Sequence, residues 1–266
     1  MRRISSRQNP LVARFRALAR GRSNGDAVLL DGEHLVEEAL ASGVPLDVVA
    51  FADRDLSKHA ALADRVERAG AEAVTVPDAV LAALSPVRQP SGVVGLATLA
   101  PAPLESVLNE SPQLVLVLAG IQDAGNVGAI VRTADGCAAT GVIATEGTAD
   151  PFGWKALRGG MGSTFRMPIA TRERLSTVTD EIRRRSIPMV AAVPRGGTPL
   201  RESDLRGPVA IVLGGEGAGV PAEVESSADW RVTIPMRPPV ESFNVAVTAA
   251  LILYEASQQR RHVLVR

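Results

Sequence analysis

The feature that most constrains the fold is a continuous apolar run, LVLVLAGI, at positions 114–121. A strand with one face in water alternates apolar and polar residues, so a run without polar residues indicates a strand covered on both faces. Parallel sheets flanked by helices contain such strands. Residues 114–121 therefore predict the middle of a parallel α/β sheet.

The chain after this run alternates between helix and strand patterns. A helix and turn are predicted at 126–141, a strand at VIAT, and a helix at RLSTVTDEIRRRS. Strands are also expected at 188–193, 208–215 and 231–236, followed by a long last helix from about Asn244 to Gln259. Strands that alternate with helices are typical of a parallel sheet.

The first 100 residues show the same alternation in a smaller unit. Apolar residues at helical spacing predict an amphipathic helix with a basic outer face at 10–20. Strands are expected at 27–30, 46–51, 73–76 and 92–99, and helices at 33–43, 59–70 and 78–85. Residues 100–113 carry three prolines and no periodicity. We therefore expect an N-terminal α/β domain at 1–99, a linker at 100–112 and a second domain at 113–266.

Composition and short motifs exclude several classes of protein. Hydrophobic residues make up 46% and charged residues 22% of the chain, as in folded globular proteins. The apolar runs are shorter than the roughly 18–20 residues of a membrane span, and no secretory signal follows the charged start. The single cysteine, Cys137, makes no intramolecular disulfide, and the three histidines lack metal-ligand spacing. These features predict a cytoplasmic protein without a metal.

Charge is balanced overall but unevenly distributed. The chain has 29 basic and 29 acidic residues, so its net charge does not indicate nucleic acid. Residues 1–25 nevertheless contain seven arginines and no acid, and residues 155–185 contain eight basic and three acidic residues. All cations except Lys58 and Lys155 are arginines, whose planar guanidinium suits phosphate. A phosphate-binding surface and a genomic preference for arginine on solvated helix faces both fit this pattern.

Three segments rich in glycine or asparagine, at 123–135, 213–221 and 234–247, each follow a predicted strand. Loops at the carboxyl ends of parallel strands form the ligand crevice of open sheets, although glycines also serve tight turns. The segments therefore predict one shared pocket. Standard fingerprints fail: Ala222 stands where G-x-G-x-x-G needs its third glycine, and neither a P-loop nor a serine-hydrolase elbow is present.

Taken together and in this order, the three segments resemble the SpoU family of RNA ribose 2'-O-methyltransferases, within the SPOUT superfamily. The family has three motifs. In the first, an asparagine and a glycine open a helix that carries an arginine. The second has glycines around a glutamate, and the third is Ile-Pro-Met followed by Ser-hydrophobic-Asn-Val. The matching residues are Asn126, Gly128 and Arg132; Gly214, Gly215, Glu216, Gly217 and Gly219; and Ile234, Pro235, Met236, Ser242, Phe243, Asn244 and Val245. The resemblance runs from Leu114 to Tyr254.

This resemblance implies a parallel α/β domain whose C-terminal chain forms a deep trefoil knot, with S-adenosylmethionine as the cofactor. The second and third motifs are expected to form the cofactor bed. The expected cofactor-binding residues are Leu213, Gly214, Ile234, Met236, Ser242 and Phe243. The family also dimerises through this domain, so we expect a homodimer in which the first motif of one subunit lies near the partner's cofactor.

The expected catalytic residues are Arg132, Asn126, Glu216 and Asn244. Methyl transfer to a ribose hydroxyl requires alignment of the hydroxyl and removal of its proton. Arg132 matches the family position that activates the hydroxyl, yet a guanidinium normally keeps its proton. Either the target phosphate perturbs Arg132, or Arg132 fixes that phosphate while another group or water accepts the proton. For the other three residues, helix capping and bracing of the loop are the structural alternatives.

The first domain resembles, more loosely, the small RNA-binding domain similar to ribosomal protein L thirty that many family members carry. The resemblance implies RNA as the substrate, with ribosomal RNA ahead of transfer RNA. The expected RNA contacts are Arg14, Arg16, Arg20 and Arg158. The alternative function is that of a non-catalytic RNA-binding or ribosome-assembly protein on the same fold. A nucleotide-dependent oxidoreductase is remote, because the dinucleotide fingerprint fails.

Overall fold

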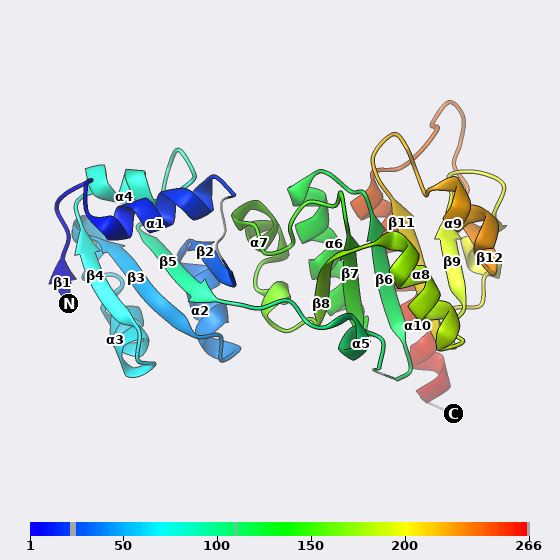
Figure 1. Cartoon of the computed structure of the whole chain (residues 1–266), viewed down its shortest axis with the longest axis horizontal. Coiled ribbons are helices and arrows are strands. Elements are labelled where there is room, and N and C mark those ends of the chain that lie inside the picture. Colours follow the sequence, from blue (N-terminus) through cyan, green and yellow to red (C-terminus); the bar gives the residue numbers. More distant parts are fainter. Residues whose placement is uncertain (22–24, 110, 265–266) are drawn as a thin grey trace. The chain divides into compact units, whose positions relative to one another are not determined.

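The structure is a computed structural model that describes residues 1–21, 25–109 and 111–264, with only the backbone of residues 262–264. Arg22, which belongs to the basic N-terminal stretch, lies outside the described residues. The chain forms two compact units, one of Met1–Ala100 with Phe152–Arg166 and one of Pro101–Pro151 with Met167–Arg266. Both units are α/β, as the sequence predicts (Figure 1).

The described residues of the first unit form a five-stranded mixed sheet in the order β1-β4-β3-β5-β2. Its strands are β1 (Arg2–Arg3), β2 (Ala27–Asp31), β3 (Leu46–Ala52), β4 (Glu72–Val76) and β5 (Val93–Thr98). Strand β5 runs antiparallel to β2 and β3. Helices α1 (Pro10–Ala19) and α4 (Asp78–Leu84) cover one face, and helices α2 (Glu33–Ala41), α3 (Ala60–Arg68) and α7 (Trp154–Gly160) cover the other.

Residues 152–166 depart from the expected division of the chain. The sequence places them in the second domain, but their apolar side chains pack in the first unit. Leu157 is buried in the core beneath α2 and α3, and Phe152 and Phe165 pack against the same core. The ion pair between Arg166 and Glu38 of α2 adds to this contact. Helix α7 therefore belongs to the fold of the first unit, although the chain enters and leaves it from strands of the second.

The described residues of the second unit form a seven-stranded sheet in the order β10-β12-β9-β11-β6-β7-β8. Its strands are β6 (Leu114–Ala119), β7 (Gly141–Thr145), β8 (Ile169–Glu173), β9 (Met189–Ala192), β10 (Thr198–Pro199), β11 (Val209–Gly214) and β12 (Trp230–Thr233). Every neighbouring pair is parallel. All six residues of β6 are buried between β11 and β7, which confirms the prediction from the apolar run.

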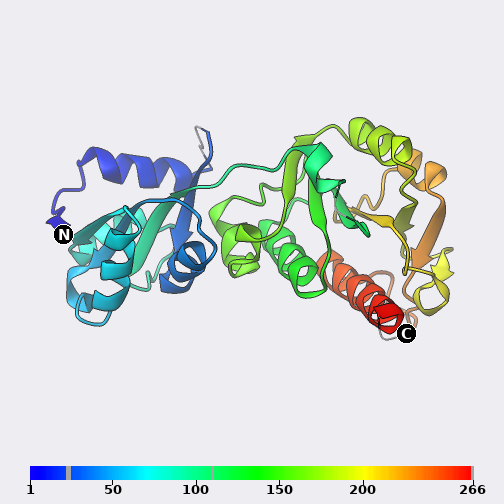
Figure 2. The same cartoon turned by 90° about the horizontal axis from the view of Figure 1, so that it is seen from below.

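Helices cover both faces of this sheet. Helices α6 (Ala124–Gly136) and α10 (Val245–Leu264) pack side by side on one face. Helices α5 (Leu104–Val107), α8 (Leu175–Arg184) and α9 (Ala222–Ser227) cover the other face (Figure 2). Single-turn 3-10 helices lie at Asp53–Asp55, Ser163–Phe165 and Leu200–Glu202. Because β9, β11 and β12 are parallel, their carboxyl ends lie at one edge of the sheet, where the candidate site lies.

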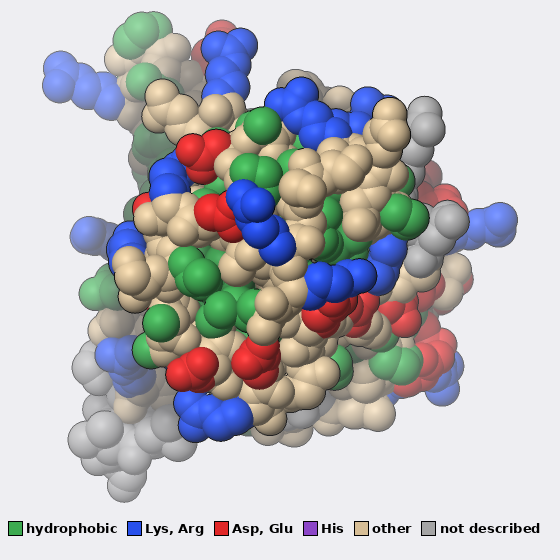
Figure 3. Space-filling view, turned by 90° about the vertical axis from the view of Figure 1, so that its left-hand side faces the viewer, with side chains coloured by type: hydrophobic (Ala, Val, Ile, Leu, Met, Phe, Trp, Pro, Cys, Tyr) green, Lys and Arg blue, Asp and Glu red, His purple; other side chains and the backbone are tan. Residues whose placement is uncertain are grey.

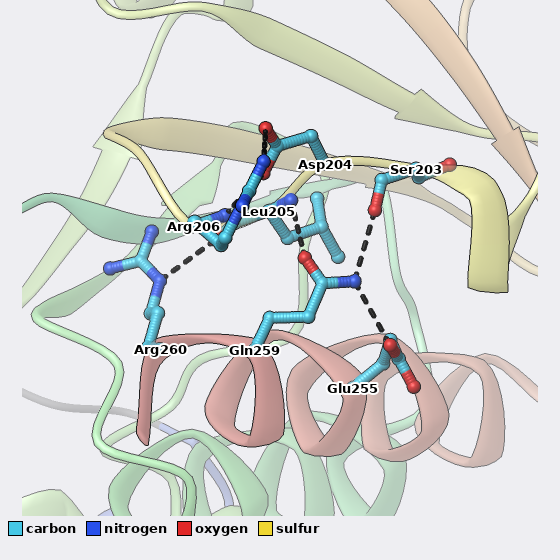
Figure 4. A network of polar contacts seen from close by, with 7 residues as sticks. All are labelled: Ser203, Asp204, Leu205, Arg206, Glu255, Gln259 and Arg260. Carbon is cyan, nitrogen blue, oxygen red and sulfur yellow. Dashed lines mark hydrogen bonds and ion pairs between the residues drawn. The ribbon is translucent and has the colours of Figure 1, made fainter. Parts of the chain in front are cut away.

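The second half of α10 is fixed by polar contacts to the segment before β11 (Figure 4). The Gln259 amide donates to the carbonyl of Ser203 at 3.0 Å and accepts from the backbone N–H of Leu205 at 2.8 Å. The Arg260 guanidinium donates to the carbonyl of Leu205 at 2.9 Å, and burial lowers its pKa. These contacts explain why the helix continues to Leu264, beyond the end expected near Gln259.

Within the described ranges, no helix is both long and apolar enough to cross a membrane. The same residues contain no group of three or more histidine, cysteine, aspartate or glutamate side chains that is arranged to hold a metal ion.

Candidate functional site

A cavity of about 480 Å³ opens at the carboxyl ends of β9, β11 and β12. Pockets of this size are typical of sites for small molecules and cofactors. All six residues expected to bind the cofactor lie in its wall: Leu213, Gly214, Ile234, Met236, Ser242 and Phe243. The second and third sequence motifs therefore face one common space, although which ligand they hold stays a prediction.

The glycines after β11 are required by close packing of the backbone. A methyl group at Gly214 would lie 1.9 Å from the carbonyl carbon of Gly219, and one at Gly215 would lie 2.2 Å from the carbonyl oxygen of Gly120. The loop closes with an antiparallel bridge between Gly215 and Gly219. Gly217 has a φ of +86°, which favours glycine. This part of the cavity wall is therefore mostly backbone.

The wall also contains residues that the sequence analysis did not identify. Ala192 ends β9, Val193 and Pro194 follow it, and Thr248 and Ile252 come from α10. The first three lie at the carboxyl end of a predicted parallel strand, so the rule that ligands bind at this edge was the available signal. Thr248 and Ile252 carried no comparable signal, because they lie inside an apolar helix whose orientation depends on tertiary packing.

Three of the four expected catalytic residues are joined by hydrogen bonds. The Asn126 side-chain amide donates to Glu216 Oε1 at 2.7 Å, and the Asn244 amide donates to Asn126 Oδ1 at 3.1 Å. The backbone N–H of Gln122 donates to Glu216 Oε2 at 3.1 Å. This chain of contacts fixes which way each amide points. It also links the loop after β6 to the cavity wall.

The Glu216 carboxylate is adapted to accept these hydrogen bonds. Partial burial raises the pKa of Glu216, but hydrogen bonds from the Asn126 side chain and from backbone amides outweigh it and hold the pKa below its ordinary value. Glu216 is therefore ionised at neutral pH and acts as an acceptor only.

The two asparagines differ in their structural roles. Asn244 Oδ1 accepts from the backbone N–H of Ala246 at 2.9 Å and so caps α10, which is the structural alternative given for it above. Asn126 does not cap α6: the helix begins earlier than predicted, and Asp123 is its N-cap, with Asp123 Oδ1 accepting from the N–H of Asn126 at 2.8 Å. The side chain of Asn126 is thus released from capping and bonds to Glu216 and Asn244.

Arg132 lies apart from this network. It is exposed on α6, two turns after Asn126, and it is not in the cavity wall. No hydrogen-bond or ion-pair partner holds its guanidinium within the described part of the chain. An exposed guanidinium of this kind is free to meet an anionic group from outside the subunit.

The expected RNA contacts divide into two kinds. Arg14 pairs with Asp47 at 3.0 Å, and Arg158 lies 3.8 Å from the buried Asp31. Arg16 and Arg20 are exposed, and no acidic residue among those described pairs with them. Whether any of the four meets RNA stays a prediction.

A parallel α/β domain with a glycine-walled cavity and an Asn–Glu–Asn network beside it has the features that the sequence predicts for an RNA methyltransferase. The profile of the SpoU rRNA Methylase family matches residues 113–254, and that of the MRM3-like substrate binding domain matches residues 2–95. The chain therefore belongs to the SpoU rRNA methylase family, which confirms the predicted family and enzyme class.

Whole-length relatives agree with this assignment. An uncharacterized tRNA/rRNA methyltransferase of Synechocystis sp. is 34% identical over 97% of this chain and 94% of its own. The 23S rRNA (guanosine(2553)-2'-O)-methyltransferase RlmP of Bacillus subtilis is 29% identical over 96% of this chain and 98% of its own. The crystal structure of an AdoMet-bound rRNA methyltransferase from Sinorhizobium meliloti, 29% identical, superposes with a TM-score of 0.82 and covers 98% of both chains.

Proposed function

We propose that the protein transfers a methyl group from S-adenosylmethionine to the 2'-hydroxyl of a ribose in ribosomal RNA. The observation that carries the proposal is the cavity whose wall holds the second and third motifs, with the Asn126–Glu216–Asn244 network beside it. The relatives named above support the reaction, and transfer RNA is the second candidate substrate. A non-catalytic RNA-binding protein would need neither the cavity nor the network.

The cavity fits S-adenosylmethionine in size and in chemistry. Backbone amides and carbonyls of the loop after β11 suit the polar groups of the cofactor, and Phe243, which is 40% exposed, offers an aromatic face for adenine. When bound, the cofactor supplies an electrophilic methyl group on its sulfonium. The protein itself holds the loop closed through its glycines and orders the third motif by capping α10 with Asn244.

Glu216, Asn126 and Asn244 act together as a positioning network. Glu216 fixes the amide of Asn126, which in turn accepts from Asn244, so the loop after β6 is held against the wall of the cavity. Arg132 binds the phosphate of the target nucleotide and so aligns the ribose hydroxyl. Two groups can accept the proton of the hydroxyl. One is Arg132, if the target phosphate perturbs its guanidinium, and the other is a different group or a water molecule.

A bulky side chain at Thr248 tests the cofactor cavity. Thr248 is half-buried on α10 and lines the cavity, so Thr248→Trp fills the space without touching the glycine loop. We expect calorimetry to show at least about a tenfold loss of affinity for S-adenosylmethionine, equivalent to about 1.4 kcal/mol. Thr248→Ser is the control and keeps the affinity. A replacement at Gly214 is unsuitable, because its side chain would collide with the backbone of Gly219.

Equal affinity in Thr248→Trp, with an unchanged melting temperature, would place the cofactor elsewhere. Ribose-methylation mapping of total RNA from cells with and without the gene then identifies the target. One ribosomal position that loses its methyl group is the expected result, and an unchanged map would contradict the proposed reaction.

The protein is also proposed to work as a homodimer through the second unit. Val247, Leu251 and Tyr254 are 46%, 40% and 61% exposed and share one face of α10 by their spacing. Phe243 precedes the helix and is also exposed. Large apolar side chains aligned on an exposed helix favour a protein partner. The family resemblance implies that in such a dimer the first motif of one subunit lies near the cofactor of the other, which would account for the position of Arg132 outside the cavity wall.

Leu251→Arg tests this interface. A charge placed at the centre of an apolar interface lacks a partner, so sedimentation at micromolar concentration is expected to show a monomer for the variant and a dimer for the parent protein. Ser176→Arg, at an exposed position of helix α8 on the other face of the sheet, serves as the matched control and keeps the dimer. A parent protein that sediments as a monomer would refute the interface.

Two further features of the proposal come from the family. The deep trefoil knot is what the family resemblance implies, and the parallel sheet together with the superposition on the Sinorhizobium meliloti structure supports the fold in which it is expected. A cytoplasmic location is supported by the ribosomal RNA methyltransferases among the relatives.

A further inference from the structure

Two basic stretches that are more than 130 residues apart in sequence meet in the first unit. The indole N–H of Trp154, at the start of α7, donates to the carbonyl of Ala19 in α1 at 3.1 Å. That carbonyl is one of the last four of α1, which have no partner within the helix. The Lys155 ammonium lies 5.5 Å from the centroid of the Trp154 ring, within the range of a cation–π contact. Trp154 thus ties Lys155 to the end of α1.

The end of α1 carries two cations of its own. Arg16 and Arg20 are four residues apart, so their side chains project from the same side of the chain, before and after Ala19. Arg16, Arg20 and Lys155 are all exposed. No carboxylate in the described part of the chain pairs with any of the three.

Elsewhere in the first unit, most arginines are neutralised by the protein itself. Carboxylate partners hold Arg2, Arg3, Arg14, Arg54 and Arg65. Figure 3 shows this on one face of the unit, where basic and acidic side chains lie next to one another. Arg16 and Arg20 at the end of α1 and Lys155 beside Trp154 have no carboxylate partner among the described residues, and they therefore differ from most arginines of the unit.

We propose that Arg16, Arg20 and Lys155, with Trp154 holding Lys155 in place, form one surface that binds the phosphate backbone of the substrate RNA. We call these four residues the α1–α7 surface. The inference rests on the proposed function and names the part of the protein that meets the RNA. Unpaired, exposed cations lose little on binding phosphate, whereas Arg14 and Arg158 must first give up Asp47 and Asp31.

The α1–α7 surface also explains what residues 152–166 contribute when they pack in the first unit. This segment lies inside the part of the sequence that matches the SpoU family, yet it packs in the first unit. Its Trp154 donates to the last carbonyl of α1, and its Lys155 adds the third cation. Substrate binding by the first unit would therefore depend on a segment encoded within the methyltransferase domain.

The test compares full-length variants for binding to a fluorescent RNA stem-loop across a salt series. Arg16→Ala/Arg20→Ala/Lys155→Ala is expected to lose about tenfold or more in affinity at moderate salt, and its slope of log affinity against log salt should fall by about 2 to 3, one per phosphate contact. Arg2→Ala/Arg3→Ala/Arg65→Ala is the matched control, because it removes the same number of exposed cations from the same unit and each of these arginines has a carboxylate partner. It should change both quantities little.

Trp154→Phe keeps an aromatic ring but removes the N–H that bonds to Ala19. Its RNA affinity should fall between that of the parent and that of the triple variant. Melting temperatures and calorimetry with S-adenosylmethionine are measured for every variant, because cations near the end of α1 also offset the helix dipole.

The outcomes separate this inference from the proposed function. A parent protein that binds S-adenosylmethionine but neither binds nor methylates RNA overturns the proposed function and the inference with it. A parent that binds RNA with the same affinity and salt slope as a stably folded triple variant overturns the α1–α7 surface alone. Equal losses in the Arg2→Ala/Arg3→Ala/Arg65→Ala control and in the triple variant of the surface also overturn it, because binding would then follow total charge and not this surface.

Discussion

Replacement of Arg132 by alanine is expected to reduce methyl transfer by about 10³-fold while leaving the affinity for S-adenosylmethionine unchanged. The physical reason is the position of Arg132: its guanidinium is exposed on α6, has no partner within the described residues, and lies outside the cavity wall. Cofactor binding by the subunit therefore does not require the Arg132 guanidinium. Alignment of the phosphate next to the reacting ribose does require it. Transfer of labelled methyl groups and cofactor calorimetry measure the two effects separately.

Arg132→Lys should also be a poor enzyme, because lysine keeps the charge but loses the bidentate fork that fixes a phosphate. Arg201→Ala is the control, since Arg201 is another exposed arginine of the second unit. Methyl transfer at the parental rate by Arg132→Ala would show that the catalytic position is wrongly assigned. A loss of cofactor affinity in that variant would instead place Arg132 in the cofactor site.

A mixing experiment tests whether Arg132 acts across the proposed dimer. Arg132→Ala and Thr248→Trp subunits are each expected to be inactive alone, one for lack of the guanidinium and the other for lack of cofactor. If the arginine of one subunit completes the site of its partner, mixed dimers contain one site with both defects and one intact site. Recovery of part of the parental activity on mixing is the expected result. Continued inactivity in proven mixed dimers would confine Arg132 to its own subunit.

Much of the second unit could be predicted from sequence because its signals are local. An unbroken apolar strand such as β6 has few structural alternatives, and the loops that follow parallel strands must meet at one edge. The network of Asn126, Glu216 and Asn244 was within reach only through the family motifs, because composition and periodicity do not identify partners 90 and 118 residues apart.

Tertiary contacts account for what the sequence did not predict. Leu157 and Trp154 have the pattern of any short amphipathic helix, and nothing in the pattern states which core they enter. The sequence does not distinguish Arg14 from Arg16. In the structure, Arg14 pairs with Asp47, which is 33 residues away in the chain. The start of α6 was placed too late because both Asp123 and Asn126 are good capping residues, and only the backbone decides between them.

Glu216→Gln is expected to lower methyl transfer by about 10²-fold, the usual cost of displacing a positioned group by about 1 Å. The Glu216 carboxylate accepts from two donors, the Asn126 amide at Oε1 and the Gln122 N–H at Oε2. A glutamine offers one acceptor and one N–H₂ group, so one of the two donors must face another donor. If Asn126 turns its amide to adapt, its oxygen no longer faces the amide of Asn244, and the network is broken at that contact instead.

The pH dependence of stability provides an independent measurement on the same variant. Hydrogen bonds hold the pKa of Glu216 below its ordinary value in the folded protein, so the folded state binds fewer protons there than the unfolded chain does. The stability that ionised Glu216 contributes is therefore fully present above the ordinary glutamate range and is lost as the pH falls through the lowered pKa. Denaturant titrations should show the parent more stable than Glu216→Gln near neutral pH, with the difference shrinking under acidic conditions. Glu223→Gln, at an exposed glutamate of α9, is the control. A difference in stability that stays constant from neutral to acidic pH would show that the charge of Glu216 does not hold the network together.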